Sequence, residues 1–220
     1  MMKNKRLNPK TIEFFGPPGS GKTTLAKKYA LKNGLIFIII NSRRQRYGYD
    51  FIYFFTHPIK FFKLLVITVI QGRRSFVLLR HKLHRLSHHL ALAAKSDWLS
   101  HQRPVVIDEG LAQYFFSVYE QSVAAAAIKN YFQQFVQSDI LVFITAVETI
   151  RLDRMLQRGR IPRWHANFNP QRWLKNIVMN AHLIPEQLTN PPFKFLFFDT
   201  TTNDYDLVVQ ELADKIRQLL

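Results

Sequence analysis

The sequence predicts an α/β fold of three layers, in which helices cover both faces of a doubly wound, parallel five-stranded sheet. Two observations predict it. Five short, nearly continuous runs of β-branched and aromatic residues recur along the chain, as in parallel strands that are buried on both faces. Longer segments with helical periodicity separate these runs. The 220 residues, 47% of them hydrophobic, suffice for a single domain spanning 1–220.

The expected strands follow the five apolar runs. They are TIEFF (11–15), LIFIII (35–40), PVVID (104–108), DILVFIT (139–145) and FKFLFFDT (193–200). Helices are expected at 22–33, 58–71, 74–100, 111–137, 148–158, 170–188 and 204–219. The longest gap between consecutive strands, 41–103, is expected to hold an inserted helical cap that forms the acceptor region.

A glycine-rich loop lies between the first strand and the first helix. Its sequence, GPPGSGKT, fits G-x-x-x-x-G-K-[ST] at every specified position. Glycines allow successive backbone N–H groups to surround phosphate oxygens, and the helix N-terminus adds partial positive charge. Lys22 can reach the β and γ phosphates of ATP, and the Thr23 hydroxyl can ligate Mg²⁺. We therefore predict a nucleotide site formed by Gly16, Pro17, Pro18, Gly19, Ser20, Gly21, Lys22, Thr23 and Thr24.

Through GPPGSGKTT the chain resembles the P-loop NTPases, and in particular their nucleotide- and small-molecule-kinase branch. The resemblance implies ATP and Mg²⁺ as cofactors and an acid at the end of the third strand as a metal ligand opposite Thr23. RPVVIDEG places Asp108 and Glu109 there, where ligands of open α/β sheets bind. Asp108 is thus the expected second Mg²⁺ ligand, and Glu109 is a candidate base, although one of the two acids can instead cap the next helix.

Many kinases of this branch carry a further acid just after the second strand. Here that position reads NSRRQR, with no acid before Asp50, which leaves the identity of the base open. Arg43, Arg44 and Arg46 lie there instead. Such a cluster suits an acceptor that already carries phosphate or carboxylate, and the alternative is an ordinary set of surface arginines.

The helix expected at 148–158 has two faces, in the sequence ETIRLDRMLQRGR. One should carry an apolar stripe of Leu152, Met155 and Leu156, and another should carry Arg151, Arg154 and Arg158. This is similar to the arginine-rich LID of nucleoside and nucleotide kinases, which closes over the phosphates. The similarity implies a LID-like segment at 151–170 with Arg154, Arg158 and Arg160 at the phosphates, although exposed arginines are common on helices.

Charge is concentrated in the cap. Twelve of the 31 lysines and arginines lie in 41–103 against two acids, within a net charge of +16. Such a segment favours polyanions, with a solvated basic face as the simpler alternative. Its mixture of apolar and basic residues also suits contact with an anionic membrane, whereas no recognised nucleic-acid-binding signature is present.

The leading hypothesis is an ATP- and Mg²⁺-dependent phosphotransferase. The arginines favour a small, anionic acceptor, and a nucleoside, a nucleotide, a sugar derivative and a lipid-linked alcohol remain open. The alternatives are a nucleotide hydrolase or switch, whose basic cap docks on membrane or nucleic acid, and a nucleotide-binding protein without turnover. The absence of cysteines removes disulfides, thiolate metal sites and cysteine nucleophiles. We expect no secretory signal and a cytoplasmic location, with peripheral membrane contact and the oligomeric state left open.

Overall fold

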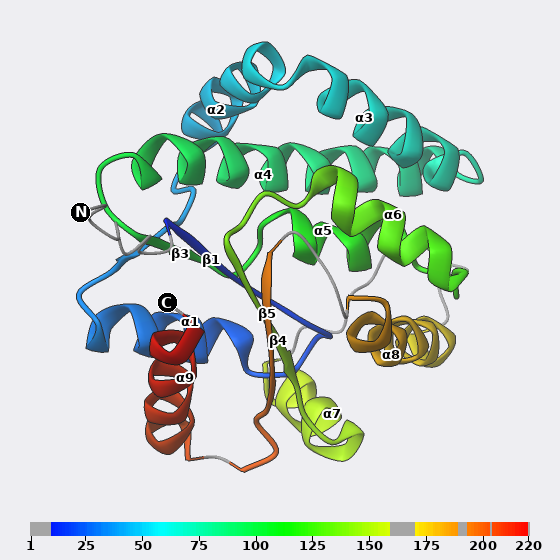
Figure 1. The fold of residues 1–220 in the computed structure, drawn as a ribbon. Helices are drawn as coiled ribbons and strands as arrows, with labels where there is room; N and C mark the ends of the chain where they lie inside the picture. Colours follow the sequence, from blue (N-terminus) through cyan, green and yellow to red (C-terminus); the bar gives the residue numbers. More distant parts are fainter. Residues whose placement is uncertain (1–9, 159–169, 189–192, 203, 220) are drawn as a thin grey trace.

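The computed structural model describes residues 10–158, 170–188, 193–202 and 204–219 (Figure 1). Its sheet has five parallel strands in the order β2-β3-β1-β4-β5. The strands are β1 (Thr11–Phe15), β2 (Ile36–Phe37), β3 (Val105–Ile107), β4 (Ile140–Thr145) and β5 (Lys194–Asp199). The predicted five-stranded parallel sheet is confirmed, with each strand inside its expected range.

Both faces of the sheet are buried, which explains the continuous apolar runs. In the central strand, Ile12 and Phe14 pack against α1 (Lys22–Lys32) and α9 (Tyr205–Leu219). Phe15 points to the opposite face and contacts Phe143 of β4, with ring centroids 5.2 Å apart. Alternate side chains of one strand thus enter two separate cores.

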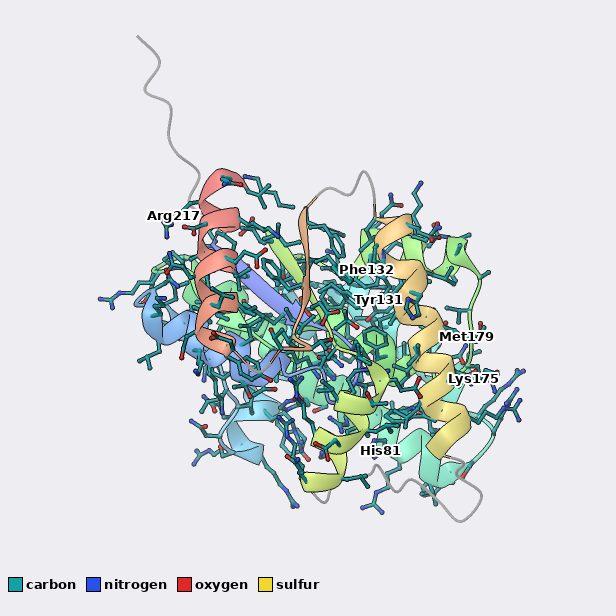
Figure 2. The ribbon with its side chains drawn as sticks, turned by 90° about the horizontal axis from the view of Figure 1, so that it is seen from below. His81, Tyr131, Phe132, Lys175, Met179 and Arg217 are labelled. Carbon is teal, nitrogen blue, oxygen red and sulfur yellow. The ribbon has the colours of Figure 1, made fainter. Side chains whose placement is uncertain are left out.

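The helices on the second face are α4 (Phe76–Ser100), α5 (Leu111–Val118), α6 (Ala125–Phe135) and α8 (Pro170–Gln187) (Figure 1). The single helix expected at 111–137 is wrong in one respect, because a loop at 119–124 divides it into α5 and α6. On α8, Trp173 and Ile177 are buried while Lys175 and Met179 lie on its outer side (Figure 2).

The segment between β2 and β3 forms three helices. α4 lies on the sheet, and α2 (Arg43–Thr56) and α3 (Pro58–Gly72) pack on α4 as the layer farthest from the sheet (Figure 1). The sequence analysis missed α2, although its start carries a capping signal: the Ser42 hydroxyl accepts from the Gln45 N–H at 3.1 Å. No single helix in the described ranges is long and apolar enough to span a bilayer, and the pair α2–α3, bent by 115°, passes only when taken together.

A buried carboxylate on β1 fixes the start of α5. Glu13 is only 1% exposed, and its Oε1 accepts from the N–H groups of Ala112 and Gln113 at 2.7 and 3.2 Å. Its Oε2 accepts from the Ser138 hydroxyl at 2.9 Å. Burial raises the pKa of Glu13 to about 7, although these hydrogen bonds oppose the shift. The sequence analysis did not single out Glu13.

The raised pKa of Glu13 makes folding stability depend on pH. An acid whose pKa rises from 4.5 to about 7 on folding keeps its proton in the folded state while the unfolded chain ionises, so stability falls as pH rises through this window. Glu13→Gln mimics the protonated acid. We expect the free energy of unfolding of this variant, relative to wild type, to grow by about 3 kcal/mol between about pH 4.5 and pH 8.

Denaturant unfolding over this pH range measures the effect. Glu211→Gln is the matched control, because Glu211 is exposed on α9 and pairs with Lys215 in the neighbouring turn. A stability difference between Glu13→Gln and wild type that stays constant with pH would contradict the assignment.

Candidate active site

The glycine loop curves tightly around the start of α1. Gly19 and Gly21 have φ of +78° and +81°, a region that side chains rarely adopt. A Cβ at Gly19 would lie 2.3 Å from the carbonyl oxygen of Arg151, and one at Gly21 would lie 2.4 Å from the hydroxyl of Tyr205. Both glycines therefore allow neighbouring helices to approach the loop, and Gly21 caps α1.

The loop is braced from the side of α7 (Glu148–Gln157) and β5. Arg154 donates to the carbonyl oxygen of Gly19 at 3.4 Å and to that of Thr200 at 2.8 Å. The buried Thr200 hydroxyl in turn donates to the carbonyl oxygen of Ser20. Arg154 thus holds the backbone of the loop.

The predicted faces of α7 are partly wrong. Met155 is buried, but Leu152 and Leu156 are 37% and 63% exposed. Arg151 is buried instead, and its Nε donates to the carbonyl oxygen of Ala146 at 3.0 Å. The arginine takes an interior position because a main-chain acceptor at the end of β4 satisfies it, which periodicity does not reveal.

Two oxygen ligands suited to Mg²⁺ meet where β1 and β3 end. The Thr23 hydroxyl hydrogen-bonds to the Asp108 carboxylate, so both oxygens can contact one ion. Hydroxyl and carboxylate oxygens are the ligands that Mg²⁺ prefers, with waters and phosphate oxygens completing the set. Burial raises the pKa of Asp108, and burial lowers that of Lys22, although the nearby carboxylates of Glu109 and Asp108 oppose the shift at Lys22. Thr23 and Asp108 are therefore suited to hold Mg²⁺.

Glu109 is held by two histidines of α4. Its Oε2 lies 3.0 Å from His88 Nε2, and its main-chain oxygen accepts a hydrogen bond from His89 Nδ1. Burial alone would raise the pKa of Glu109, but the His88 hydrogen bond and the positive charge of Lys22 hold it below its usual value. Glu109 is therefore ionised at neutral pH.

His89 is neutral under the same conditions. It is 1% exposed, and burial lowers its pKa to about 4. Because Nδ1 must carry the hydrogen donated to the carbonyl oxygen, Nε2 is left as an acceptor, and it has no hydrogen-bond partner within the described part of the chain. The sequence analysis did not single out His88 or His89.

A large cavity of about 860 Å³ lies over the glycine loop. Pro18, Gly19, Thr23 and Thr24 line it, and Gly16, Pro17, Ser20 and Gly21 complete the loop. Its cationic lining consists of Lys22, Lys27, Lys28 and Arg158. The volume and the charge suit a nucleoside triphosphate.

A smaller cavity of about 180 Å³ lies between α4, α5 and α8. Lys22 and Glu109 line both cavities, so they stand where the two meet. The remaining lining includes Trp173 and Phe116, which are aromatic, and Arg85, His81, His89 and Glu120, which are polar or charged. His81 and α8 can be followed in Figure 2. Aromatic walls with a few polar groups are typical of small-molecule sites.

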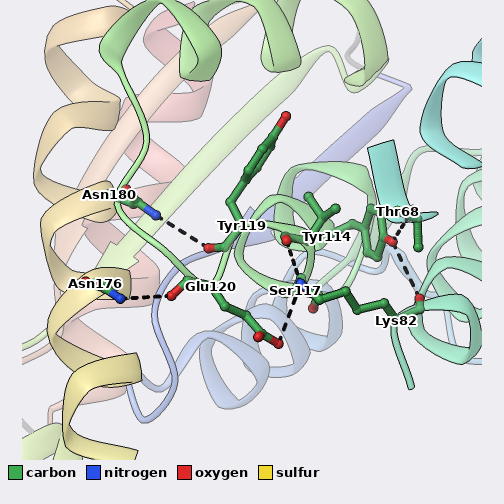
Figure 3. Close-up of polar contacts among 9 residues, drawn as sticks. Thr68, Lys82, Tyr114, Ser117, Tyr119, Glu120, Asn176 and Asn180 are labelled. Carbon is green, nitrogen blue, oxygen red and sulfur yellow. Dashed lines mark hydrogen bonds and ion pairs between the residues drawn. The ribbon is translucent and has the colours of Figure 1, made fainter. Parts of the chain in front are cut away.

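The loop that carries Glu120 is fixed from two sides (Figure 3). Lys82 of α4, only 2% exposed, donates to the Val118 carbonyl oxygen at 2.7 Å and lies 3.8 Å from the Glu120 carboxylate. From α8, Asn176 donates to the main-chain oxygen of Glu120 at 3.1 Å, and Asn180 to that of Gln121 at 2.9 Å. One wall of the smaller cavity is therefore rigidly placed.

The structure brings together Lys22, Thr23, Asp108, Glu109 and Arg158. Arg43, Arg44 and Arg46 line neither of the two cavities: the first two are exposed at the start of α2, and Arg46 is buried with Nη1 3.2 Å from His84 Nε2. Arg160 lies outside the described residues. Trp173 was missed, since only its position on α8 relates it to the site.

No family model matches this sequence, and no curated protein matches it. Among solved structures it is similar to deoxyadenosine kinase from M. mycoides with dCMP and dCDP bound, at 12% identity and a TM-score of 0.57 over 94% of this chain and 99% of that chain. The same enzyme with dATP bound gives 13% identity and a TM-score of 0.54 over the same shares. Shikimate kinase from Bacteroides thetaiotaomicron is also found, at 16% identity and a TM-score of 0.48 over 94% and 98%.

At such low sequence identity, the similarities show the fold and nothing further. Together with the glycine loop they confirm the expected resemblance: the chain has the α/β fold of the P-loop kinases.

Proposed function

We propose that the protein is an ATP- and Mg²⁺-dependent phosphotransferase that moves the γ-phosphoryl group to a small acceptor. The observation that carries the proposal is that Lys22 and Glu109 line both the large cavity and the smaller one. ATP bound in the large cavity and an acceptor bound in the smaller one would meet between the Lys22 ammonium and the Glu109 carboxylate. Phosphoryl transfer needs mostly such positioning and charge neutralisation.

In the proposed step, an acceptor hydroxyl oxygen forms a bond to the γ-phosphorus while the bond from that phosphorus to the β–γ bridging oxygen breaks. Glu109 is ionised and takes the hydroxyl proton, and ADP leaves with the electron pair of the broken bond. Lys22 and Arg158 stabilise the charge on the phosphoryl oxygens, and His88 holds the Glu109 carboxylate in place.

Mg²⁺ would be held by Thr23 and Asp108, and it would neutralise charge on the β and γ phosphates. Arg154 keeps the backbone of the glycine loop in the curve that phosphate binding requires. Arg160 remains a proposed contact to the phosphates from the LID-like segment.

The acceptor cavity suits a ring-bearing molecule that carries hydroxyl or anionic groups. Trp173 and Phe116 offer flat apolar walls, and Arg85 offers a guanidinium for an anionic group. Because Arg85 lines this cavity and Arg46 does not, we assign charge recognition there to Arg85 and leave Arg43 and Arg44 to parts of the acceptor that extend beyond it. A nucleoside, a nucleotide and a sugar derivative all meet this description, and the similarity to deoxyadenosine kinase supports the first two.

The first test is ATP turnover by the purified protein with and without a pooled extract of small metabolites. We expect ADP to form only with extract, together with a product heavier by one phosphoryl group. ADP formed equally without extract, and with no new product, would overturn the proposal in favour of a nucleotide hydrolase or switch.

Lys22→Ala should abolish transfer, because among the described residues no other lysine lines both cavities. We expect the turnover number to fall by at least about 10²-fold, as when one preorganised charge partner is lost. Lys32→Ala is the control, since Lys32 is exposed at the last turn of the same helix. Equal activity of Lys22→Ala and Lys32→Ala would remove the assignment of the loop.

The two acids at the end of β3 should respond differently. Glu109→Gln should lower turnover by about 10²-fold while leaving ATP binding intact, because it removes the proton acceptor alone. Asp108→Asn should lower it further and raise the Mg²⁺ concentration needed for half-maximal rate. Titrations of Mg²⁺ and ATP against both variants separate the roles, and the reverse ranking would exchange them.

Trp173→Ala should weaken binding of the acceptor without weakening binding of ATP. Removal of a buried aromatic wall should raise the KM for the acceptor by at least about tenfold while the KM for ATP stays within about twofold. Met179→Ala on the same helix is the control, because Met179 is 46% exposed and points away from the core (Figure 2). If both KM values rise together in Trp173→Ala, the smaller cavity does not hold the acceptor separately from ATP.

A further inference from the structure

The outer layer of the molecule, α2 and α3 with the start of α4, exposes an unusual concentration of large apolar side chains. Eleven of the twenty exposed large hydrophobic residues in the described ranges lie between 47 and 77. We call this surface the outer cap face. It consists of Tyr47, Phe51, Ile52, Phe55, Ile59, Phe62, Val66, Val69, Ile70, Phe76 and Val77.

The helix α3 has two apolar sides, one that packs on the core and a second that forms part of the outer cap face. On α3, Leu64 and Thr68 are buried toward α4 and α5, and the Thr68 hydroxyl lies 2.7 Å from that of Tyr114 (Figure 3). Ile59, Phe62 and Val66 recur at spacings of three and four on the other side, each more than half exposed. A helix that is apolar on all sides is normally covered on all sides.

The same holds for α2. Tyr53 is fully buried against the core, whereas Phe51 and Phe55, one turn apart, are 64% and 63% exposed with their rings 4.5 Å from each other. No described segment covers them, because α2 and α3 are the layer farthest from the sheet (Figure 1). Contiguous exposed apolar surface of this kind marks a site of contact with a partner.

The charge around the outer cap face has one sign. Exposed basic side chains at its borders are Arg43, Arg44, Lys63, Arg73, Arg74 and Arg80. The only acid in α2 and α3 is Asp50, which accepts a hydrogen bond from Ser87 and is thereby directed toward α4. The face therefore complements a partner that is apolar inside and negatively charged at its border.

We propose that the outer cap face docks on an anionic lipid bilayer, with the phenylalanines and aliphatic side chains among the upper acyl chains and the arginines at the headgroups. Interfacial helices combine these two sets of residues in this way. A second copy of the chain fits less well, because a two-fold interface would bring the same basic border onto itself. This inference concerns a surface that is separate from both cavities, and it does not depend on the proposed transfer reaction.

Co-sedimentation of the full chain with vesicles tests the proposal. The vesicles are phosphatidylcholine alone or phosphatidylcholine mixed with phosphatidylglycerol. We expect binding to the anionic vesicles only, and weaker binding as salt screens the headgroups. Phe55→Ser/Phe62→Ser should weaken partitioning by at least about tenfold, because two exposed rings that would enter the acyl chains are lost. Arg73→Gln/Arg74→Gln should weaken it and reduce its salt dependence.

Matched controls lie on the opposite side of the molecule. Leu31→Ser/Leu207→Ser removes two exposed apolar side chains from α1 and α9, and Lys215→Gln/Arg217→Gln removes two charges from α9. Neither should change vesicle binding, and circular dichroism should be the same for all four variants. Equal binding to neutral vesicles, equal losses in the controls, or no binding at all would overturn the proposal. So would light scattering that shows a dimer abolished by Phe55→Ser/Phe62→Ser, since the face would then join two copies.

Discussion

The candidate site depends on one buried carboxylate, Glu13. It lies on the central strand, beneath the point where β1 leads into the glycine loop, and it binds the first free N–H groups of α5. A Cβ at Gly110 would come within 2.5 Å of the Glu13 carboxyl carbon, so a glycine is needed there for space. The turn Asp108–Glu109–Gly110 is thereby fixed relative to β1, and this sets the separation of Asp108 from Thr23.

Hydrogen bonds at both ends of the glycine loop stabilise the same arrangement. Gln113, in the first turn of α5, accepts from the N–H of Gly16 at 2.9 Å, and Arg154 and Thr200 hold the other end of the loop by its carbonyl groups. These contacts join four segments that are far apart in the sequence. A site for a highly charged ligand benefits from such preorganisation, because dipoles that are already in place need no reorientation when charge develops.

The sequence could predict the parts of this arrangement that are local. The five strands follow from continuous apolar runs, and the glycine loop follows from a motif whose residues are adjacent in the chain. Glu13, His88 and His89 could not be found in this way, because their roles arise from contacts between segments that are far apart in the chain. The stripe predicted on α7 failed for a different reason: Arg151 finds a main-chain acceptor close by in the chain, the carbonyl group of Ala146 just after β4, and a pattern of hydrophobic residues does not reveal such a partner. A capping pair at Ser42 and Gln45 was present for α2, but a run of arginines and aromatics obscured it.

The structure also shows where the positive charges of the cap lie, whereas the sequence gives only their number. The basic segment between β2 and β3 carries ten of the sixteen net positive charges. Because the segment is helical, these charges lie on two different surfaces. Arg85, on the inner side of α4, lines the smaller cavity, which the proposed reaction assigns to the acceptor. Arg73 and Arg74 lie in the turn between α3 and α4 and border the outer cap face. Because α4 and the layer above it separate the two sets, a change at the outer cap face can alter where the protein binds without altering the charge that its cavities present.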